Sequence, residues 1–146
     1  MRKLQWFPYR AYVEFLEAID RRFGKGSGSY GRDLGTDAGE RDLGTIFRIY
    51  VALASPERLI RSCARVWEGY YRNAGHMEAI AWDPENTVLR IHDFPKMASI
   101  HCRLMEGWMI RTMATIGCIV QPGSSETACT SQGAPYHEFS ARWVKR

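Results

Sequence analysis

Residues 126–139 read ETACTSQGAPYHEF, and three potential metal ligands in this segment lie close to one turn glycine, Gly133. They are Glu126, Cys129 and His137. Cys102 supplies a fourth donor from a helix-forming segment upstream. Zinc in proteins is bound by cysteine sulfur, histidine nitrogen and carboxylate oxygen, and structural sites have four protein ligands. The residue chemistry therefore fits one closed, structural zinc site, which favours a binding module over an enzyme.

The segment has the pattern of a β-hairpin with Gly133 at its apex. Residues equidistant from the apex pair across such a hairpin, so Cys129 is predicted to face His137 and Thr127 to face Phe139. Directly opposed side chains have Cβ atoms about 4.5–5.5 Å apart, which is close enough to share an ion. Because side chains alternate along a strand, one apolar inner face is expected to hold His137, Phe139, Ala141 and Trp143.

The other two ligands need additional structure. Glu126 lies an odd number of residues from Cys129, so a bulge, or a loop ending at residues 123–125, is required to turn it inward. Cys102 belongs to a predicted helix over residues 96–116, which Gly117 ends. At helical spacing Cys102 falls on an apolar stripe with Ala98, Met105, Met109 and Ile116.

The C-terminal third of the chain resembles 4-vinyl-reductase-type domains, a family of small-molecule-binding modules that includes the sensor domains of aromatic-catabolism activators. The whole chain is also similar to single-domain members of myxobacterial type. In the aromatic sensors a helix cysteine, a glutamate and two signature cysteines hold a structural zinc. The resemblance assigns these places to Cys102, Glu126, Cys129 and His137, with histidine in place of the second cysteine and Ala134 in place of an aspartate. It is carried by Cys102, Gly107, Glu126, Cys129, Gly133, Pro135, Tyr136, His137 and Phe139.

Ordinary core packing is the alternative interpretation of these ligands. Free cysteine is a common small core residue, and a lone inward histidine is usually just hydrogen-bonded.

Length and composition bound the class of protein. The 146 residues predict one domain with an adequate core, and 45% hydrophobic content argues against disorder. The sequence contains no apolar run long enough to predict a membrane span. No secretion signal is recognised at the start, and four cysteines without a small disulfide scaffold suit the cytoplasm. The net charge is +4, but the basic residues are scattered along the sequence, so nucleic-acid binding is not expected.

Helices, a hairpin, a long helix and further strands follow one another along the chain. This order predicts an α+β fold in which helices cover an antiparallel sheet. The resemblance implies the same architecture, because 4-vinyl-reductase-type domains are related in fold to haem nitric-oxide sensors and Golgi tethering subunits. The predicted helices cover residues 8–23, 30–38, 41–54, a segment opened by Ser55-Pro56-Glu57, and 96–116. The predicted strands cover 76–82, 87–92, 118–121, 126–130 and 136–143.

The related folds can hold a hydrophobic ligand between helices and sheet. Aromatic side chains can stack on a bound ring, and ordinary core packing is the alternative for each of them. The candidates for lining the cavity are Phe47, Tyr50, Trp67, Trp82 and Trp108.

Haem is not expected, because the chain lacks the Tyr-x-Ser-x-Arg clamp of the nitric-oxide sensors, and His76, His92 and His101 are predicted at the surface or in the hairpin. Catalytic signatures are also missing. We therefore expect a zinc-stabilised module that binds a small hydrophobic or aromatic molecule and acts through a partner or homodimer. A scaffold protein with a filled cavity, as in the Golgi relatives, is the main alternative. A reductase-like auxiliary enzyme is a weaker one.

Overall fold

The computed structural model of the chain describes residues 6–43, 55–94 and 97–146. These form an α+β fold with an antiparallel sheet and flanking helices. The helices are α1 (Tyr9–Phe23), α2 (Tyr30–Leu43), α4 (Pro56–Arg61), α5 (Cys63–Tyr70), α6 (Ser99–Thr115) and the short 3-10 helix η1 (Thr130–Gln132). The strands are β1 (His76–Trp82), β2 (Asn86–His92), β3 (Cys118–Val120), β4 (Ser125–Ala128) and β5 (His137–Lys145).

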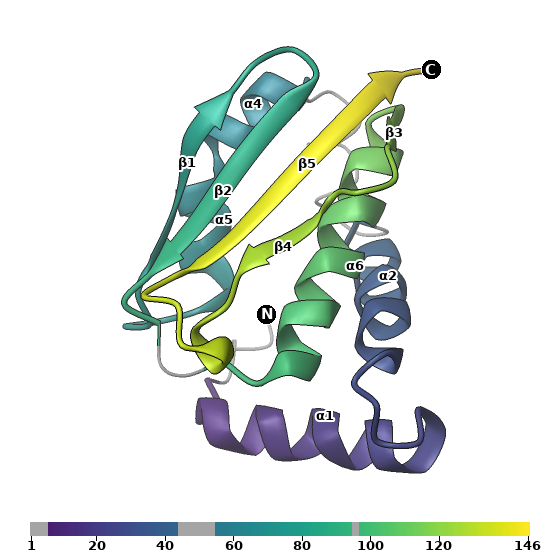
Figure 1. Ribbon diagram of the computed structural model, residues 1–146, viewed down its shortest axis with the longest axis vertical. Coiled ribbons are helices and arrows are strands. Elements are labelled where there is room, and N and C mark those ends of the chain that lie inside the picture. Colours follow the sequence, from purple (N-terminus) through teal and green to yellow (C-terminus); the bar gives the residue numbers. More distant parts are fainter. Residues whose placement is uncertain (1–5, 44–54, 95–96) are drawn as a thin grey trace, which may run out of the picture.

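Strand β5 organises the sheet. It pairs with β2 on one side, and on the other side its first half pairs with β4 and its last residues with β3. Strand β1 pairs only with β2 and forms an edge of the described sheet (Figure 1). The C-terminal segment of the chain is therefore at the centre of the sheet.

Side-chain alternation along β5 confirms the predicted inner face. His137, Phe139 and Trp143 are buried, whereas Glu138 and Ser140 between them are half-buried. The inner face packs on α6, which carries the buried side chains Cys102 and Met105 into the same core as Phe139. The last strand and the long helix are thus held together by apolar packing.

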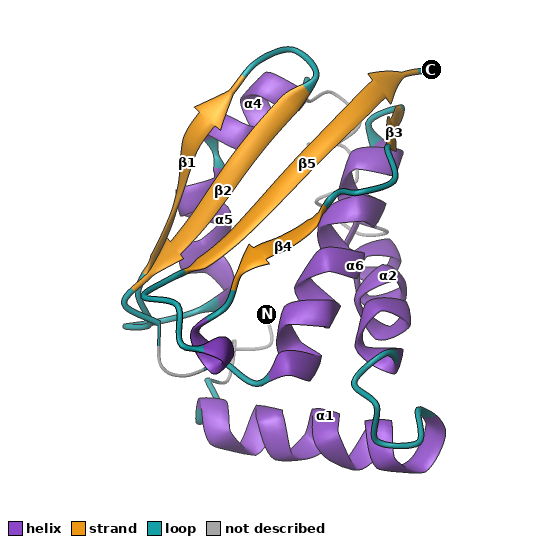
Figure 2. Cartoon of the chain, in the orientation of Figure 1, coloured by secondary structure: helices purple, strands orange, loops and turns teal. Residues whose placement is uncertain are grey.

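The helix predicted to start at Ser55 forms as two pieces. The Ser55 hydroxyl accepts a hydrogen bond from the Arg58 backbone N–H, which confirms the predicted cap. The helix then breaks at Ser62, whose hydroxyl donates to the Arg58 carbonyl, and α5 begins at the next residue. Figure 2 shows α4 and α5 behind the β1–β2 hairpin, where Ile60 and Trp67 are buried.

Helices α2 and α6 approach closely through glycines. A Cβ atom added at Gly35 would lie 1.8 Å from the Leu104 carbonyl oxygen, and one added at Gly107 would lie 2.0 Å from the Arg32 carbonyl oxygen. Only residues without a side chain fit this contact. It fixes α6 between α2 and the sheet.

One predicted helix is longer in the structure, and part of the first helix is exposed. The helix predicted over 30–38 continues to Leu43, and the rest of the helix predicted over 41–54 lies outside the described residues. The large apolar side chains of Phe15 and Phe23 on α1 are exposed. Helix α1 lies across the end of α6 rather than along it (Figure 1), and it contacts the core along one stripe that includes Tyr12 and the buried Leu16.

In the part of the chain that the structure describes, no helix combines the length and apolar character needed to cross a membrane.

Candidate metal centre and adjoining cavity

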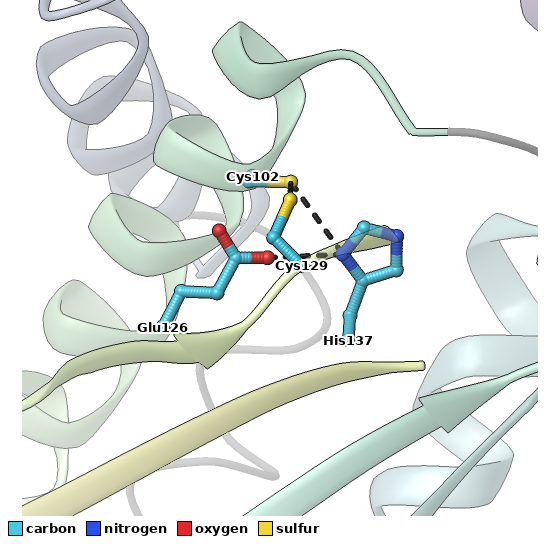
Figure 3. A group of neighbouring side chains, drawn as sticks. All are labelled: Cys102, Glu126, Cys129 and His137. Atoms are coloured by element: carbon cyan, nitrogen blue, oxygen red, sulfur yellow. Dashed lines mark hydrogen bonds and ion pairs between the residues drawn. The ribbon is translucent and has the colours of Figure 1, made fainter. Parts of the chain in front are cut away.

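The structure brings Cys102, Glu126, Cys129 and His137 together (Figure 3). Cys102 comes from α6, Glu126 from β4, Cys129 from the residue before η1, and His137 from the start of β5. Their ligand atoms all lie within 4.8 Å of one another. The four side chains are nearly or completely buried, with exposed fractions between 0% and 8%.

The two donor distances from Cys102 match the edges of a zinc tetrahedron, and the distance between His137 and Glu126 is shorter. Bonds of about 2.3 Å to sulfur and about 2.0 Å to nitrogen or oxygen imply donor separations of about 3.8 Å for two sulfurs and about 3.5 Å for sulfur and nitrogen. The Sγ atoms of Cys102 and Cys129 are 3.7 Å apart, and Cys102 Sγ is 3.7 Å from His137 Nδ1. His137 Nδ1 is 2.9 Å from Glu126 Oε1. The donor set can therefore enclose one ion after small movements.

A β-bulge turns Glu126 toward the site, as its spacing from Cys129 requires. Glu126 pairs with Phe139, whereas Ala128 pairs with Glu138, so Thr127 is the additional residue. The predicted pairing of Thr127 with Phe139 is wrong for this reason. After the bulge, the pairing of Ala128 with Glu138 is the one expected for a hairpin centred on Gly133, which adopts the left-handed conformation (φ 90°).

Two hydroxyl groups orient the ligands. Thr130 Oγ1 lies 2.7 Å from His137 Nε2, so the ring nitrogen that faces away from the cluster is hydrogen-bonded. Ser131 Oγ lies 2.8 Å from Cys129 Sγ. Histidine ligands of metals almost always donate their second ring N–H to such an acceptor, which fixes the tautomer and leaves the other nitrogen for the ion.

Glu106 on α6 supports the cluster from a distance. Its carboxylate accepts hydrogen bonds from the backbone N–H of Glu126, from Arg32 on α2 and from Arg103. Burial alone would raise the pKa of Glu106, but these hydrogen bonds and the two guanidinium charges outweigh it and hold the pKa below its usual value. Glu106 is 3% exposed. Through these hydrogen bonds its buried carboxylate joins α2, α6 and β4.

We expect Glu106→Gln to lower stability by about 1–3 kcal/mol at neutral pH, because a hydrogen-bonded buried charge is lost. The native pKa of Glu106 lies below the unfolded value of about 4.3. Its contribution is therefore complete above that value and is lost as the pH falls through the native pKa. Urea unfolding should show a difference between wild type and variant that shrinks below about pH 4. In Glu57→Gln, which removes an exposed pair with Arg61, the loss should stay below about 0.5 kcal/mol; an equal loss would contradict the assigned role.

The cluster gathers three acidic groups in a buried place, namely the thiols of Cys102 and Cys129 and the carboxyl group of Glu126. Burial raises the pKa of the Cys102 thiol, and neighbouring Glu126 and Cys129 raise it further. A cation beside Cys102 would favour its thiolate, because a nearby positive charge stabilises the ionised form. Zinc would supply such a cation, because it is bound by cysteine as the thiolate.

A cavity of about 170 Å³ lies between α5 and α6. An engineered cavity of about 150 Å³ with apolar walls binds benzene, so the volume suits a small aromatic ring. Helix α6 supplies one wall through Leu104, Met105, Trp108 and Met109. Methionine side chains adapt to the shape of a ligand, and four of the six methionines line this cavity: Met77, Met105, Met109 and Met113.

Polar groups at the cavity wall are bonded to the protein. The Asp42 carboxylate accepts from the Tyr70 hydroxyl at 2.7 Å and from Trp108 Nε1 at 3.2 Å. The Thr112 hydroxyl donates to the Trp108 carbonyl at 2.8 Å. With these groups engaged, the wall presents mainly apolar surface to a ligand.

The five predicted cavity residues are not all in one place. Trp67 and Trp108 line the cavity. The prediction for Trp82 is wrong, because this ring is 37% exposed on β1, with the Arg61 guanidinium 5.8 Å from its centre. Phe47 and Tyr50 lie outside the described residues.

His101 was predicted near the surface but is completely buried on α6. Its Nδ1 is 2.9 Å from the Tyr9 hydroxyl and its Nε2 is 2.6 Å from the Tyr71 hydroxyl. Burial, with a smaller effect of His137, lowers the pKa of His101 to about 3, so the ring is neutral. This buried chain of hydrogen bonds joins α1, α6 and the segment after α5.

No protein-family model matches the sequence, and the search of curated proteins finds no match either. Solved structures nevertheless share the fold. The Fe(II) unliganded H-NOX protein from K. algicida superposes with a TM-score of 0.73 at 7% identity, covering 98% of this chain and 77% of the other. For the H-NOX protein from S. oneidensis in the Fe(II)NO state, the TM-score is 0.63 at 12% identity, with 97% and 78% covered. Trafficking protein particle complex subunit 3 from Naegleria fowleri, covalently bound to palmitic acid, gives 0.63 at 13% identity, with 93% and 92% covered.

The fold likeness raises the question of haem, and the histidines do not fit it. The chain has four. His137 belongs to the buried cluster, and both ring nitrogens of His101 are bonded to tyrosines. His76 and His92 lie together on the β1–β2 hairpin, away from the cavity lining. A haem iron held by histidine needs a free imidazole nitrogen facing the ring, so we derive no function through haem.

Proposed function

We propose that the chain is a zinc-stabilised module, related to the 4-vinyl-reductase-type domains, that binds a small apolar molecule in the cavity between α5 and α6. One observation carries this proposal: α6 supplies both the buried ligand Cys102 and a wall of the cavity. A bound ion would join α6 to the last hairpin and hold that wall in place. Metal binding and cavity shape would therefore be coupled through folding.

The ligand class follows from the cavity lining and size. Apolar and methionine side chains dominate the wall, and the polar groups Asp42, Tyr70 and Thr112 are bonded within the protein. A benzene-sized hydrocarbon fits these properties better than a strongly polar molecule. Occupancy would be reported to a partner or a second copy by favouring one conformation of the module.

A scaffold with a permanently filled cavity is the second candidate. It is favoured by the fold shared with a subunit that carries covalent palmitic acid and by Cys63, whose side chain lines the cavity. Burial raises the pKa of the Cys63 thiol, however, and a protonated buried thiol is a poor nucleophile. The observations therefore favour reversible binding of a small molecule.

Filling the cavity should abolish ligand binding without removing the metal. In Val66→Trp the larger ring would occupy the cavity from α5. We expect wild-type protein to be stabilised by saturating benzene or toluene, by about 2.7 kcal/mol at a hundred times Kd, and the variant to show no such shift. Thermal unfolding with and without each compound measures this effect.

Ala64→Trp on the exposed side of the same helix is the matched control, and it should keep the wild-type response. Native mass spectrometry of the purified protein separates the two candidate functions. A releasable small molecule, or an empty chain that binds the probes, supports the proposal. A covalent acyl adduct on Cys63, or no response to any apolar probe, would contradict it.

A further inference from the structure

We propose a second metal site on the outer face of the β1–β2 hairpin, formed by His76, Glu78 and His92. Its expected ion is a divalent metal that prefers imidazole, such as zinc, nickel or copper. The site shares no residue with the buried cluster or the cavity, so it does not depend on the function proposed above.

The strand register brings the three donors together. His76 and Glu78 are two residues apart on β1 and therefore point to the same side of the sheet. His92 on β2 lies directly opposite His76. The two imidazole rings stack with centres 5.0 Å apart and planes 18° apart. His92 Nε2 lies 2.8 Å from Glu78 Oε1.

The donor atoms of this group lie within 4.8 Å of one another, as in the buried cluster. A further carboxylate is near, because Asp93 Oδ2 is 3.9 Å from His76 Nδ1. Two imidazoles and a carboxylate are a common ligand set for transition metals with open coordination positions. A histidine pair on paired strands requires little rearrangement to bind an ion.

The neighbouring positive charge is already engaged. Arg90 lies directly opposite Glu78 in the ladder, but its guanidinium bonds the Glu138 carboxylate at 2.6 Å and stacks over the Tyr136 ring at 4.0 Å. Glu78 is therefore left with His92 as its close partner. A cation at this place would meet one carboxylate and two imidazoles.

The two sites differ in ways that an experiment can separate. The hairpin site is partly exposed, with side-chain exposures of 57% for His76, 50% for Glu78 and 26% for His92. It contains no sulfur and has at most three close protein donors among the described residues. An ion bound there should exchange quickly with solvent and keep water in its shell.

Equilibrium dialysis of the full chain against zinc chloride tests the proposal. We expect the wild-type chain to bind a rapidly exchanging equivalent of zinc, and His92→Ala to remove it. Glu78→Gln should weaken the zinc affinity at least about tenfold, since loss of a ligand costs at least as much as loss of a supporting contact. Glu85→Gln, an exposed carboxylate in the turn of the same hairpin, should leave binding unchanged. Cys129→Ser, which alters the buried cluster, should also retain this equivalent.

Nickel chloride provides an independent measurement on unaltered protein. Paramagnetic Ni²⁺ should broaden the amide NMR signals of residues 76–78 and 91–93 before those of residues 129–137. The site would be overturned if the wild-type protein held no rapidly exchanging ion, or if the double variant His76→Ala with His92→Ala still held it. Broadening of NMR signals elsewhere in the chain would also overturn the site. Failure of the buried zinc site would instead appear as loss of the slowly exchanging equivalent alone.

Discussion

Replacement of Cys129 by serine should lower the free energy of unfolding by more than about 4 kcal/mol, because loss of a structural metal is among the largest single-residue effects. At about 2–4 °C per kcal/mol for a chain of this size, the unfolding midpoint should fall by about 10 °C or more. The physical reason is that the buried donor atoms of Cys102, Glu126 and His137 would lose the ion that joins them. Thermal unfolding with and without added zinc measures the effect.

Cys63→Ser and Cys118→Ser are matched controls, because both cysteines are buried outside the cluster. Each should cost about 1–3 kcal/mol through burial of a hydroxyl, and each should keep the full response to zinc. Similar losses in all four cysteine variants, with no dependence on zinc, would indicate simple core packing and contradict the metal site.

Gly35→Ala should destabilise the protein by about 3 kcal/mol or more, the upper end of the cost of overpacking. Its Cβ would lie 1.8 Å from the Leu104 carbonyl oxygen and 2.9 Å from the Trp108 backbone nitrogen. Backbone cannot rotate away as a flexible side chain can, so α2 must move off α6. Urea unfolding gives the change in free energy, and probe binding reports whether the cavity wall moves with it.

Gly69→Ala is the control for the same substitution in a helix. An added Cβ at Gly69 would meet nothing within 4 Å, and alanine is a better helix former than glycine by about 0.5–1 kcal/mol. We therefore expect neutral or slightly raised stability. If Gly35→Ala behaved like Gly69→Ala, the close contact between α2 and α6 would be wrong.

Much of the fold could be predicted because the local signals agree with the tertiary structure. The alternation of His137, Phe139 and Trp143 identified the inner face of β5, and Ser55-Pro56 identified the start of α4. The spacing between Glu126 and Cys129 required a bulge, which β4 contains. The regular spacing of Gly31, Gly35 and Gly39 is a further sequence signal for the close α2–α6 contact.

Other features depend on packing that no local pattern reports. The burial of His101 follows from the position of α1 across the end of α6, where Tyr9 reaches one side of the ring. Trp82 lies at the sheet edge because β1 has only one strand partner. Glu106 lies one helical turn after Cys102, a spacing that places both on one side of α6. Its role depends on Arg32 of α2, which is distant in sequence and bonds the Glu106 carboxylate.

A bound ion would lie in a chain of contacts that runs from α2 through α6 to the last hairpin. Arg32 bonds Glu106, Glu106 holds the backbone of Glu126, and Glu126 joins His137. These contacts would make metal loss, the Glu106 substitution and the Gly35 substitution act on the same cavity wall. Their effects on probe binding should therefore have the same sign.

X-ray absorption at the zinc edge, on protein dialysed to remove weakly held ions, measures whether the buried cluster holds zinc. We expect one zinc per chain with two sulfur neighbours at about 2.3 Å and two nitrogen or oxygen neighbours at about 2.0–2.1 Å. A folded protein without zinc, or with zinc that has no sulfur neighbour, would contradict it.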